Sequence, residues 1–453
     1  MVTSYMRPPH PASPPSPPAK SAGGEGARLG GVANRFSQNP SPIDRLTEPS
    51  SAFSPTLFVG EKVAEGRMRG FAERSAARKF TQGLCLLLIA FASIAMSDYD
   101  ADLARLKKQA DDLRAAPNAD PAMLAAVLYR RASMTVEFTE LQTAERAIDD
   151  AILVAPTPDL FLLRANFNFK MHRLQRAKDD LAQLVDGNTG EPVKTLAAQI
   201  AMQEGDYAAA RGAYRELADR TRSWDSIASL AYYESVTGDP AAADRLYVRA
   251  EDELSAKEMR AYAWVEVQRG IIDFDRARYA AALVHYQRAG RAYSGYWLVE
   301  EHLAEDLDRL GRTTESIALY QKIIDQTHNP EYVSALAAIL ARTDRDAAKR
   351  LDAEAAQLYD AQFKLYPEAT GGHLIRHLLS REDTPPSRLV DLAQQNADLR
   401  PNAEAKLLLA KSYWKAGRAT DAQRLLAEVR QTPWRTPELV AFERVVRRGG
   451  GAR

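Results

Sequence analysis

Cysteine is almost absent from this sequence, because its 453 residues include only Cys85. A chain with one thiol cannot form an internal disulfide. Cys85 also lies in an apolar run that we expect to be removed, which would leave a body without thiols and would exclude cysteine catalysis there. A thiol-free body suits an oxidising compartment, although many cytosolic proteins share this composition.

Net charge is absent as well. The chain has 60 basic and 60 acidic residues, and both signs are mixed along its length. Proteins that bind nucleic acids usually concentrate basic residues on one face. We therefore expect no nucleic-acid partner.

Catalytic motifs are also missing. The sequence has no glycine-rich phosphate loop, no nucleophile elbow and no convincing strand pattern. His373 and His377 have the i, i+4 spacing that can bind a metal, but the residues between them lack the glutamate of the metalloprotease pattern. We expect a polar stripe on a helix there, with metal binding or enzymatic activity as the alternative. No enzyme activity, cofactor or metal is predicted.

The first part of the chain differs in composition from the rest. Residues 1–67 are rich in Pro, Ser and Gly, and eleven of the 24 prolines fall between Pro8 and Pro55. Such a segment buries too little apolar surface to offset the entropy of ordering it. We predict that residues 1–67 are a disordered extension.

Segment 68–96 has the features of a secretory signal. Four basic residues, Arg69, Arg74, Arg78 and Lys79, precede a 12-residue apolar run at 84–95 that ends in small residues. A membrane-spanning helix needs roughly 20 apolar residues. We predict that Met68 is the true start, that residues 1–67 are mis-assigned, and that the protein is periplasmic or secreted. The alternatives are a membrane anchor, with transient membrane association through 84–95, and a buried helix in a cytoplasmic protein.

Small residues recur with a period of 33 over the middle of the chain. One series is Ala132, Ala165, Ala198 and Ala231, and a second, 12 residues later, is Ala144, Ala177, Ala210 and Ala243. Larger residues follow the second series by four and by seven, which marks one face of a helix. Turn residues such as Gly205-Asp206 and Gly238-Asp239 lie between the two series. Each unit is therefore predicted to be two antiparallel helices that cross at the alanines.

This unit resembles the tetratricopeptide repeat (TPR), which has a small residue at position 8, Gly near 15, Ala at 20 and an aromatic residue or Leu at 24. The best matching sets are Ala198, Gly205, Ala210, Tyr214 and Leu217; Leu230, Ala231, Gly238, Ala243, Tyr247 and Ala250; and Leu409, Ala410, Tyr413, Gly417, Ala422 and Leu426. The match is degenerate between 330 and 400. The resemblance implies an all-α, right-handed α-solenoid of about nine stacked helix-turn-helix repeats over 121–436. We expect a capping helix within 97–120 and a terminal helix with a basic, Gly-rich tail at 437–453.

In TPR proteins the first helix of each repeat lines a concave groove. The resemblance therefore implies a partner-binding groove at Ser133, Val136, Asn166, Phe169, Gln199, Met202, Tyr232 and Ser235. This mixture of side chains suits an extended peptide or a partner helix, and an unoccupied, solvated face is the alternative. Tyr293, Tyr296 and Trp297 form a further cluster, which we assign to core packing rather than to a binding hot spot.

The function expected from these features is a non-catalytic scaffold exported to a bacterial-type cell envelope, where it binds a partner protein or peptide. A cytosolic TPR adaptor of a multiprotein complex is the alternative.

Overall fold

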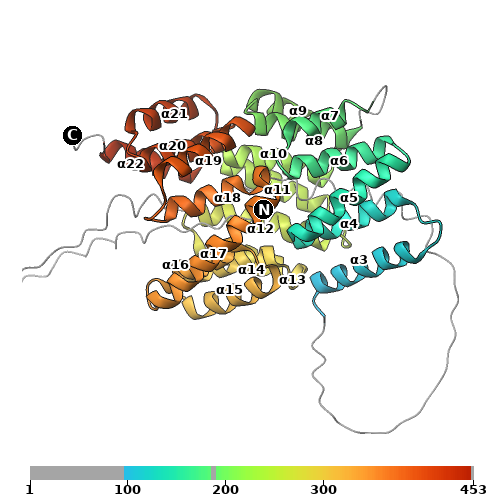
Figure 1. The fold of residues 1–453 in the computed structure, drawn as a ribbon, viewed down its shortest axis with the longest axis horizontal. Helices are drawn as coiled ribbons and strands as arrows, with labels where there is room; N and C mark the ends of the chain where they lie inside the picture. The colour runs from blue at the N-terminus through green and yellow to red at the C-terminus, as the bar shows by residue number, and fades with distance from the viewer. Residues whose placement is uncertain (1–95, 185–189, 450–453) are drawn as a thin grey trace, which may run out of the picture.

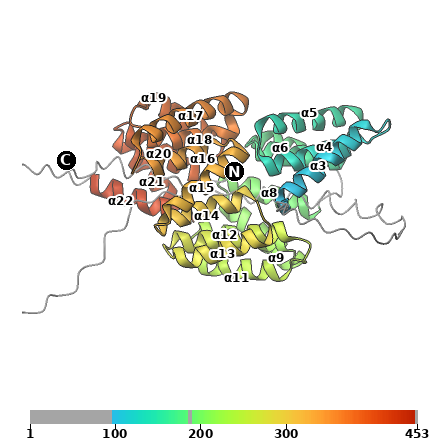
Figure 2. The ribbon, with the colours of Figure 1, turned by 90° about the horizontal axis from the view of Figure 1, so that it is seen from below.

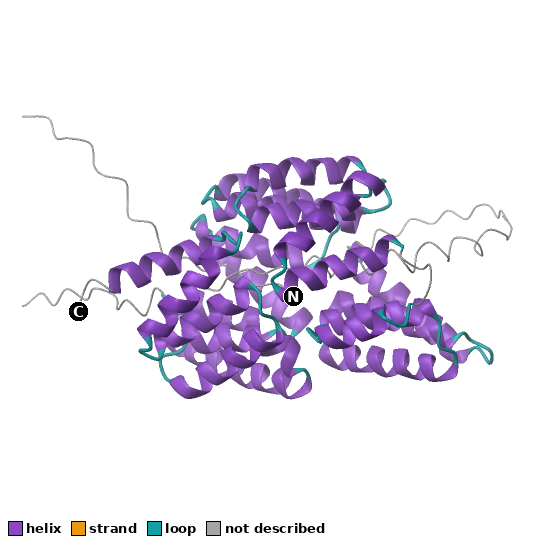
Figure 3. Cartoon of the chain, turned by 90° about the horizontal axis from the view of Figure 1, so that it is seen from above, coloured by secondary structure: helices purple, strands orange, loops and turns teal. Residues whose placement is uncertain are grey.

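The computed structural model describes residues 96–184 and 190–449, and in these ranges every regular element is a helix (Figure 3). The predicted extension 1–67, Cys85 and almost all of segment 68–96 lie outside the described residues. None of the helices within the described ranges is long and apolar enough to cross a membrane.

The helices follow one another with short connections (Figure 1). They are α3 (Asp98–Ala115), α4 (Pro121–Thr135), α5 (Phe138–Val154), α6 (Pro158–Lys170), α7 (Leu174–Leu181), α8 (Glu191–Glu204), α9 (Tyr207–Thr221), α10 (Trp224–Val236), α11 (Pro240–Asp252), α12 (Met259–Asp275), α13 (Tyr279–Ala292), α14 (Trp297–Arg309), α15 (Thr313–Thr327), α16 (Pro330–Leu340), α17 (Arg345–Leu365), α18 (Pro367–Ser380), α19 (Pro386–Leu399), α20 (Ala403–Lys415), α21 (Ala419–Gln431) and α22 (Pro437–Gly449).

The helices pack as consecutive pairs. From α4 to α21 the described residues form nine pairs, α4 with α5, α6 with α7, and so on to α20 with α21. Helix α3 packs on α4 before the first pair, and α22 follows the last. The predicted all-α solenoid is thereby confirmed.

The pairs form because the sequence fixes both the crossing points and the turns. The alanines of both predicted series are buried, and all four of the second series are fully so. Gly205 and Gly238 adopt φ of 83° and 93°, which other residues rarely adopt. Asp206 and Asp239 then cap the next helix by accepting hydrogen bonds from the backbone N–H three residues on, at 3.0 and 2.8 Å.

One unit in the degenerate region has an unusually long second helix. The connection between α16 and α17 is short, and α17 extends to 21 residues. The extra length is therefore helical, and Ala355 and Tyr359 on α17 are buried as a regular second helix requires.

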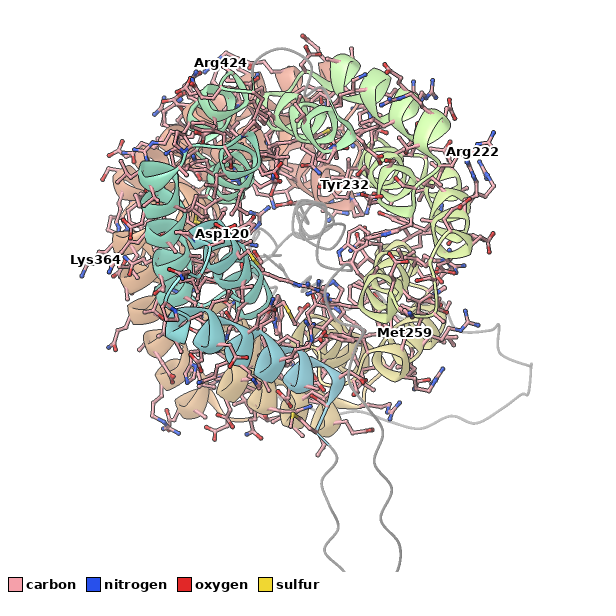
Figure 4. The ribbon with its side chains drawn as sticks, turned by 90° about the vertical axis from the view of Figure 1, so that its right-hand side faces the viewer. Asp120, Arg222, Tyr232, Met259, Lys364 and Arg424 are labelled. Atoms are coloured by element: carbon pink, nitrogen blue, oxygen red, sulfur yellow. The ribbon has the colours of Figure 1, made fainter. Side chains whose placement is uncertain are left out.

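The stack of pairs curves until it meets itself. Seen end-on in Figure 4, the helices follow one another round a ring, and a view from below shows α3 to α6 on the opposite side of the molecule from α21 and α22 (Figure 2). Residues 196 positions apart in sequence form hydrogen bonds, for example Asp98 with Ser294 and Tyr207 with Ala403.

Candidate functional site

The first and second helices of each pair have different surroundings. Helix α10 buries eleven of its 13 residues, whereas its partner α11 buries three of 13. Figure 4 shows Tyr232 of α10 on the inner side of the ring, with Arg222, Lys364 and Arg424 on the outer side. The inner side is therefore the surface on which several repeats could contact one elongated partner.

The eight predicted groove residues lie on the first helices or at their ends. Ser133, Phe169, Gln199, Met202 and Tyr232 are buried, and Val136, Asn166 and Ser235 are partly buried. Phe169 packs in a hydrophobic cluster with Leu162 and Leu174 of its own repeat and with Leu196 and Ile200 of the next. Whether these residues contact a partner remains a prediction.

Two of the polar groove residues are satisfied by their own helix. The Asn166 amide donates to the carbonyl of Leu162 at 2.8 Å, and the Ser235 hydroxyl donates to the carbonyl of Tyr232 at 2.7 Å. Val136 ends α4 in a left-handed conformation with φ of 56°. Asn166 and Ser235 therefore each have one donor fewer available to a partner.

Gln199 differs from them. Its side chain on α8 is 2% exposed, and neither its Oε1 nor its Nε2 has a hydrogen-bond partner. Buried amide groups in native proteins are nearly always paired, and leaving one unpaired costs roughly 1 to 3 kcal/mol. Gln199 thus has an unpaired donor and an unpaired acceptor at a predicted groove position, both covered in this structure.

In the C-terminal repeats, charged side chains on the first helices are buried as ion pairs. Arg376 of α18 donates to Glu404 of α20 at 2.7 Å, and Lys411 of α20 donates to Glu438 of α22 at 2.5 Å. Burial alone lowers the pKa of Arg376, but Glu404 and neighbouring carboxylates raise it above its usual value. Each pair offsets the cost of desolvating its two charges, so removing one member would leave the other uncompensated.

Sequence reasoning did not identify Asp306 on α14. Its side chain is fully buried, and neither carboxylate oxygen has a hydrogen-bond partner. Burial raises its pKa to about 7. Glu301 and Glu305, on the same helix, are also buried, so the inner part of α14 is strongly acidic.

The two histidines considered as metal ligands have separate partners. His373 Nδ1 contacts the Glu331 carboxylate, and His377 Nδ1 lies 3.3 Å from the Ser334 hydroxyl. Burial lowers the pKa of His377 to about 4. Over residues 96–184 and 190–449, no group of three or more His, Cys, Asp or Glu side chains is arranged to hold a metal ion.

The predicted aromatic cluster is buried, and it contacts α3 and the end of α4 as well as its own repeat. The Tyr293 hydroxyl donates to Asp102 of α3 at 2.8 Å. The Trp297 indole donates to the carbonyl of Met134 at the end of α4, at 2.9 Å. Tyr296 stacks on Tyr99, with ring centroids 5.7 Å apart.

Solved structures similar to this chain are TPR proteins. The Cut9–Hcn1 hetero-tetramer of APC/C matches 71% of this chain and 63% of that one, with a TM-score of 0.44 and 11% identity. Yeast Tom70 matches 78% of this chain and 97% of that one (TM-score 0.35, 14% identity). A tetratricopeptide repeat protein from Parabacteroides merdae matches 61% and 99% (TM-score 0.37, 13% identity). No family model and no curated protein matches the sequence.

Proposed function

We propose that this chain is a non-catalytic scaffold that holds a partner protein or peptide against the inner side of its ring. The first helices of consecutive repeats lie next to one another there, so their side chains form one curved surface along which binding energy can be distributed. The amide of Gln199 carries the proposal: both of its polar atoms lack a partner and are covered in this structure, and a peptide backbone admitted by a small movement of the covering side chains supplies the acceptor and the donor that they lack.

Replacing Gln199 with leucine tests this role. Full-length wild-type protein and Gln199→Leu are used to capture proteins from native extract, with quantification by mass spectrometry. We expect capture of the partner to fall roughly tenfold, the loss that about two neutral hydrogen bonds would cause. The melting temperature should stay the same or rise, because the variant removes an unpaired buried polar group.

Lys364→Ala, on the outer side of the ring, is the matched control and should capture the partner as wild type does. Equal capture by wild type and Gln199→Leu would contradict the proposed site. A lower melting temperature of Gln199→Leu would show that the residue has a structural role instead.

We further propose export to the cell envelope, with the cytosolic adaptor as the alternative. The support is the order of basic, apolar and small residues in segment 68–96, which is typical of a secretory signal. Mass spectrometry of the mature N-terminus and cell fractionation test this. We expect a chain that begins close to residue 97, and purified protein that retains residues 1–67 would contradict the proposal.

A further inference from the structure

Successive turns of the solenoid touch along a continuous line of contacts, which we call the seam. Its five steps are α3 with the α13–α14 connection, the α4–α5 turn with the α15–α16 turn, the α6–α7 turn with the α17–α18 junction, the α8–α9 turn with the α19–α20 connection, and the α10–α11 turn with the α21–α22 connection. Each step advances by one repeat on both sides. The residues that meet are 196 to 199 positions apart in several steps, which is close to six repeats of 33 residues.

The first step fastens the N-terminal end of α3, which lies beside α13 in Figure 1. The backbone N–H of Tyr99 donates to the carbonyl of Ser294 at 3.1 Å. In return, the backbone N–H and hydroxyl of Ser294 donate to the Asp98 carboxylate at 3.0 and 2.7 Å. These bonds hold the pKa of Asp98 below its usual value. Helix α3, expected to cap the first repeat, therefore also joins the first repeat to the sixth.

The second and third steps combine ionic and aromatic contacts. His328 Nδ1 lies 3.6 Å from the Glu137 carboxylate. The Tyr366 hydroxyl donates to Glu145 at 2.7 Å, and the Arg173 guanidinium lies over the Tyr366 ring, 5.3 Å from its centroid. Tyr366 is thus held by Glu145 of α5 and by Arg173 of the α6–α7 turn.

The last two steps use backbone groups. The backbone N–H of Ala403 donates to the Tyr207 hydroxyl at 2.8 Å, and that of Arg435 donates to the carbonyl of Val236 at 2.8 Å. Tyr207 also packs against Trp434, with ring centroids 6.3 Å apart. The hydrogen bonds of the seam therefore run from the start of the first turn to the end of the second.

The seam is rich in buried aromatic side chains. These are Tyr99, Phe138, Tyr207, Tyr293, Tyr296, Trp297, Tyr366 and Trp434. Tyr and Trp anchors with polar surroundings are typical of interfaces between separately folded surfaces. Helices within a turn instead cross at alanines. Among the described helices, extensive packing joins only neighbours and next-but-one neighbours in chain order, so the seam holds together through loops and side chains.

We propose that the seam is a clasp: the ring has a closed state and an open state, and the whole seam parts as a unit while every repeat stays folded. Opening it breaks loop contacts and aromatic anchors but no helix pair, so each repeat keeps the packing between its own two helices. The role of this opening rests on the proposed function: it controls lateral entry of a partner to the inner side of the ring.

Hydrogen exchange of the full-length chain tests the clasp without any partner. The double variant Tyr293→Phe/Ser294→Ala removes two hydroxyl groups from the first step and leaves the helix pairs intact. We expect exchange at the Tyr99 amide to accelerate about tenfold or more, the effect of losing two or three hydrogen bonds. If the seam parts as a unit, the distant amides of Ala403 and Arg435 accelerate as well, while amides within α12 and α13 do not.

A matched control removes similar hydroxyl groups away from the seam. Tyr262→Phe/Ser255→Ala deletes hydrogen bonds to Glu266 and Glu258 and should leave all three seam amides unchanged. Acceleration confined to Tyr99 in the seam variant would overturn the proposal, because the steps would then open independently.

A reversible lock provides the opposite change. Asp98→Cys/Ser294→Cys, in a chain that also carries Cys85→Ala, places two thiols where the carboxylate and hydroxyl now meet. Oxidation should slow exchange at Ala403 and Arg435, and reduction should restore it. If hydrogen exchange at Ala403 and Arg435 does not change with the redox state, the proposal of a clasp is also overturned. Failure to capture any partner would contradict only the proposed function, since exchange is measured on the protein alone.

Discussion

Asp306 occupies an environment that disfavours its charge. The side chain on α14 is fully buried, has no hydrogen-bond partner and lies on a helix that also carries Glu301 and Glu305. Because burial raises its pKa to about 7, the folded protein holds a proton there that the unfolded chain, with a pKa of 3.8, releases. This carboxyl therefore stabilises the fold least when it is ionised, at alkaline pH.

We expect the protein to lose stability as pH rises from about 5 to 8, and Asp306→Asn to remove most of that loss. The folded state binds more protons than the unfolded state between these pKa values, so its free energy of unfolding falls as pH rises. The contribution is roughly 2 to 4 kcal/mol at pH 8. Melting temperatures of wild type and Asp306→Asn at pH 5.5 and 8 measure it.

Asp325→Asn, at an exposed position on α15, is the control and should leave the pH dependence unchanged. A wild-type melting temperature that is higher at pH 8 than at pH 5.5, with no change in Asp306→Asn, would contradict this interpretation.

At the level of single residues, the sequence predicted where the small residues pack but did not predict which polar and charged residues are buried. The alanine series were readable because the same steric demand recurs every 33 residues. Gln199 was named as a groove residue, but its unpaired amide was not foreseen, because pairing depends on which groups the fold brings near. Asp306 carried no sequence signal, because nothing next to it in the chain distinguishes it from exposed acidic residues, and its burial is a property of the fold.

Helix pairs depend on close approach at the crossing point, and the fifth pair takes this furthest. Gly270 of α12 stands twelve residues before Ala282, where the repeats of the two alanine series have alanine. A methyl group there would overlap the ring of Tyr286 on α13. Gly270 is therefore a site at which an aromatic ring fills the space of a side chain.

We expect Gly270→Ala to destabilise the protein by about 1 to 3 kcal/mol, because the Tyr286 ring must move within a packed core. Gly212→Ala, in the exposed middle of α9 with no atom within 4 Å of the added group, should instead stabilise it by roughly 0.5 to 1 kcal/mol. Urea unfolding of both variants measures the difference, and effects of the same sign would show that packing against Tyr286 does not govern the crossing.

The degenerate region shows how far periodicity predicts an element. Helix α19 begins at Pro386, the second residue of a Pro-Pro pair, which is a local signal of a helix start. The length of α17 was not predicted, because extra helical turns change the period without changing the residues that face the core.

The ring brings together groups that lie far apart in sequence, including two basic ones. Arg400 Nη1, on the α19–α20 connection, lies 3.3 Å from His172 Nε2, on the α6–α7 turn. Burial and the nearby charge of Arg400 hold the pKa of His172 well below its usual value, and His373 and Lys170 act in the same direction. His172 is therefore neutral in the closed ring at pH 7.

Acidification should loosen the ring. Because the pKa of His172 is lowered in the closed state, the closed ring binds fewer protons than an open one, and its stability falls as pH drops below about 6.5. We expect the radius of gyration from small-angle X-ray scattering to rise between pH 7.5 and 5, and to rise less in His172→Gln. The same increase in both proteins would assign the effect to other groups.

The sequence by itself determined the helix pairs and their turns. Three features act over only a few residues: spacings of four and seven within a helix, glycines with positive φ, and aspartate caps. Each can therefore be recognised in a short stretch of sequence. Only the tertiary structure decided that the array closes and which residues form the seam. A small rotation between neighbouring repeats accumulates over about six of them, and no local pattern records that Tyr99 will meet Ser294.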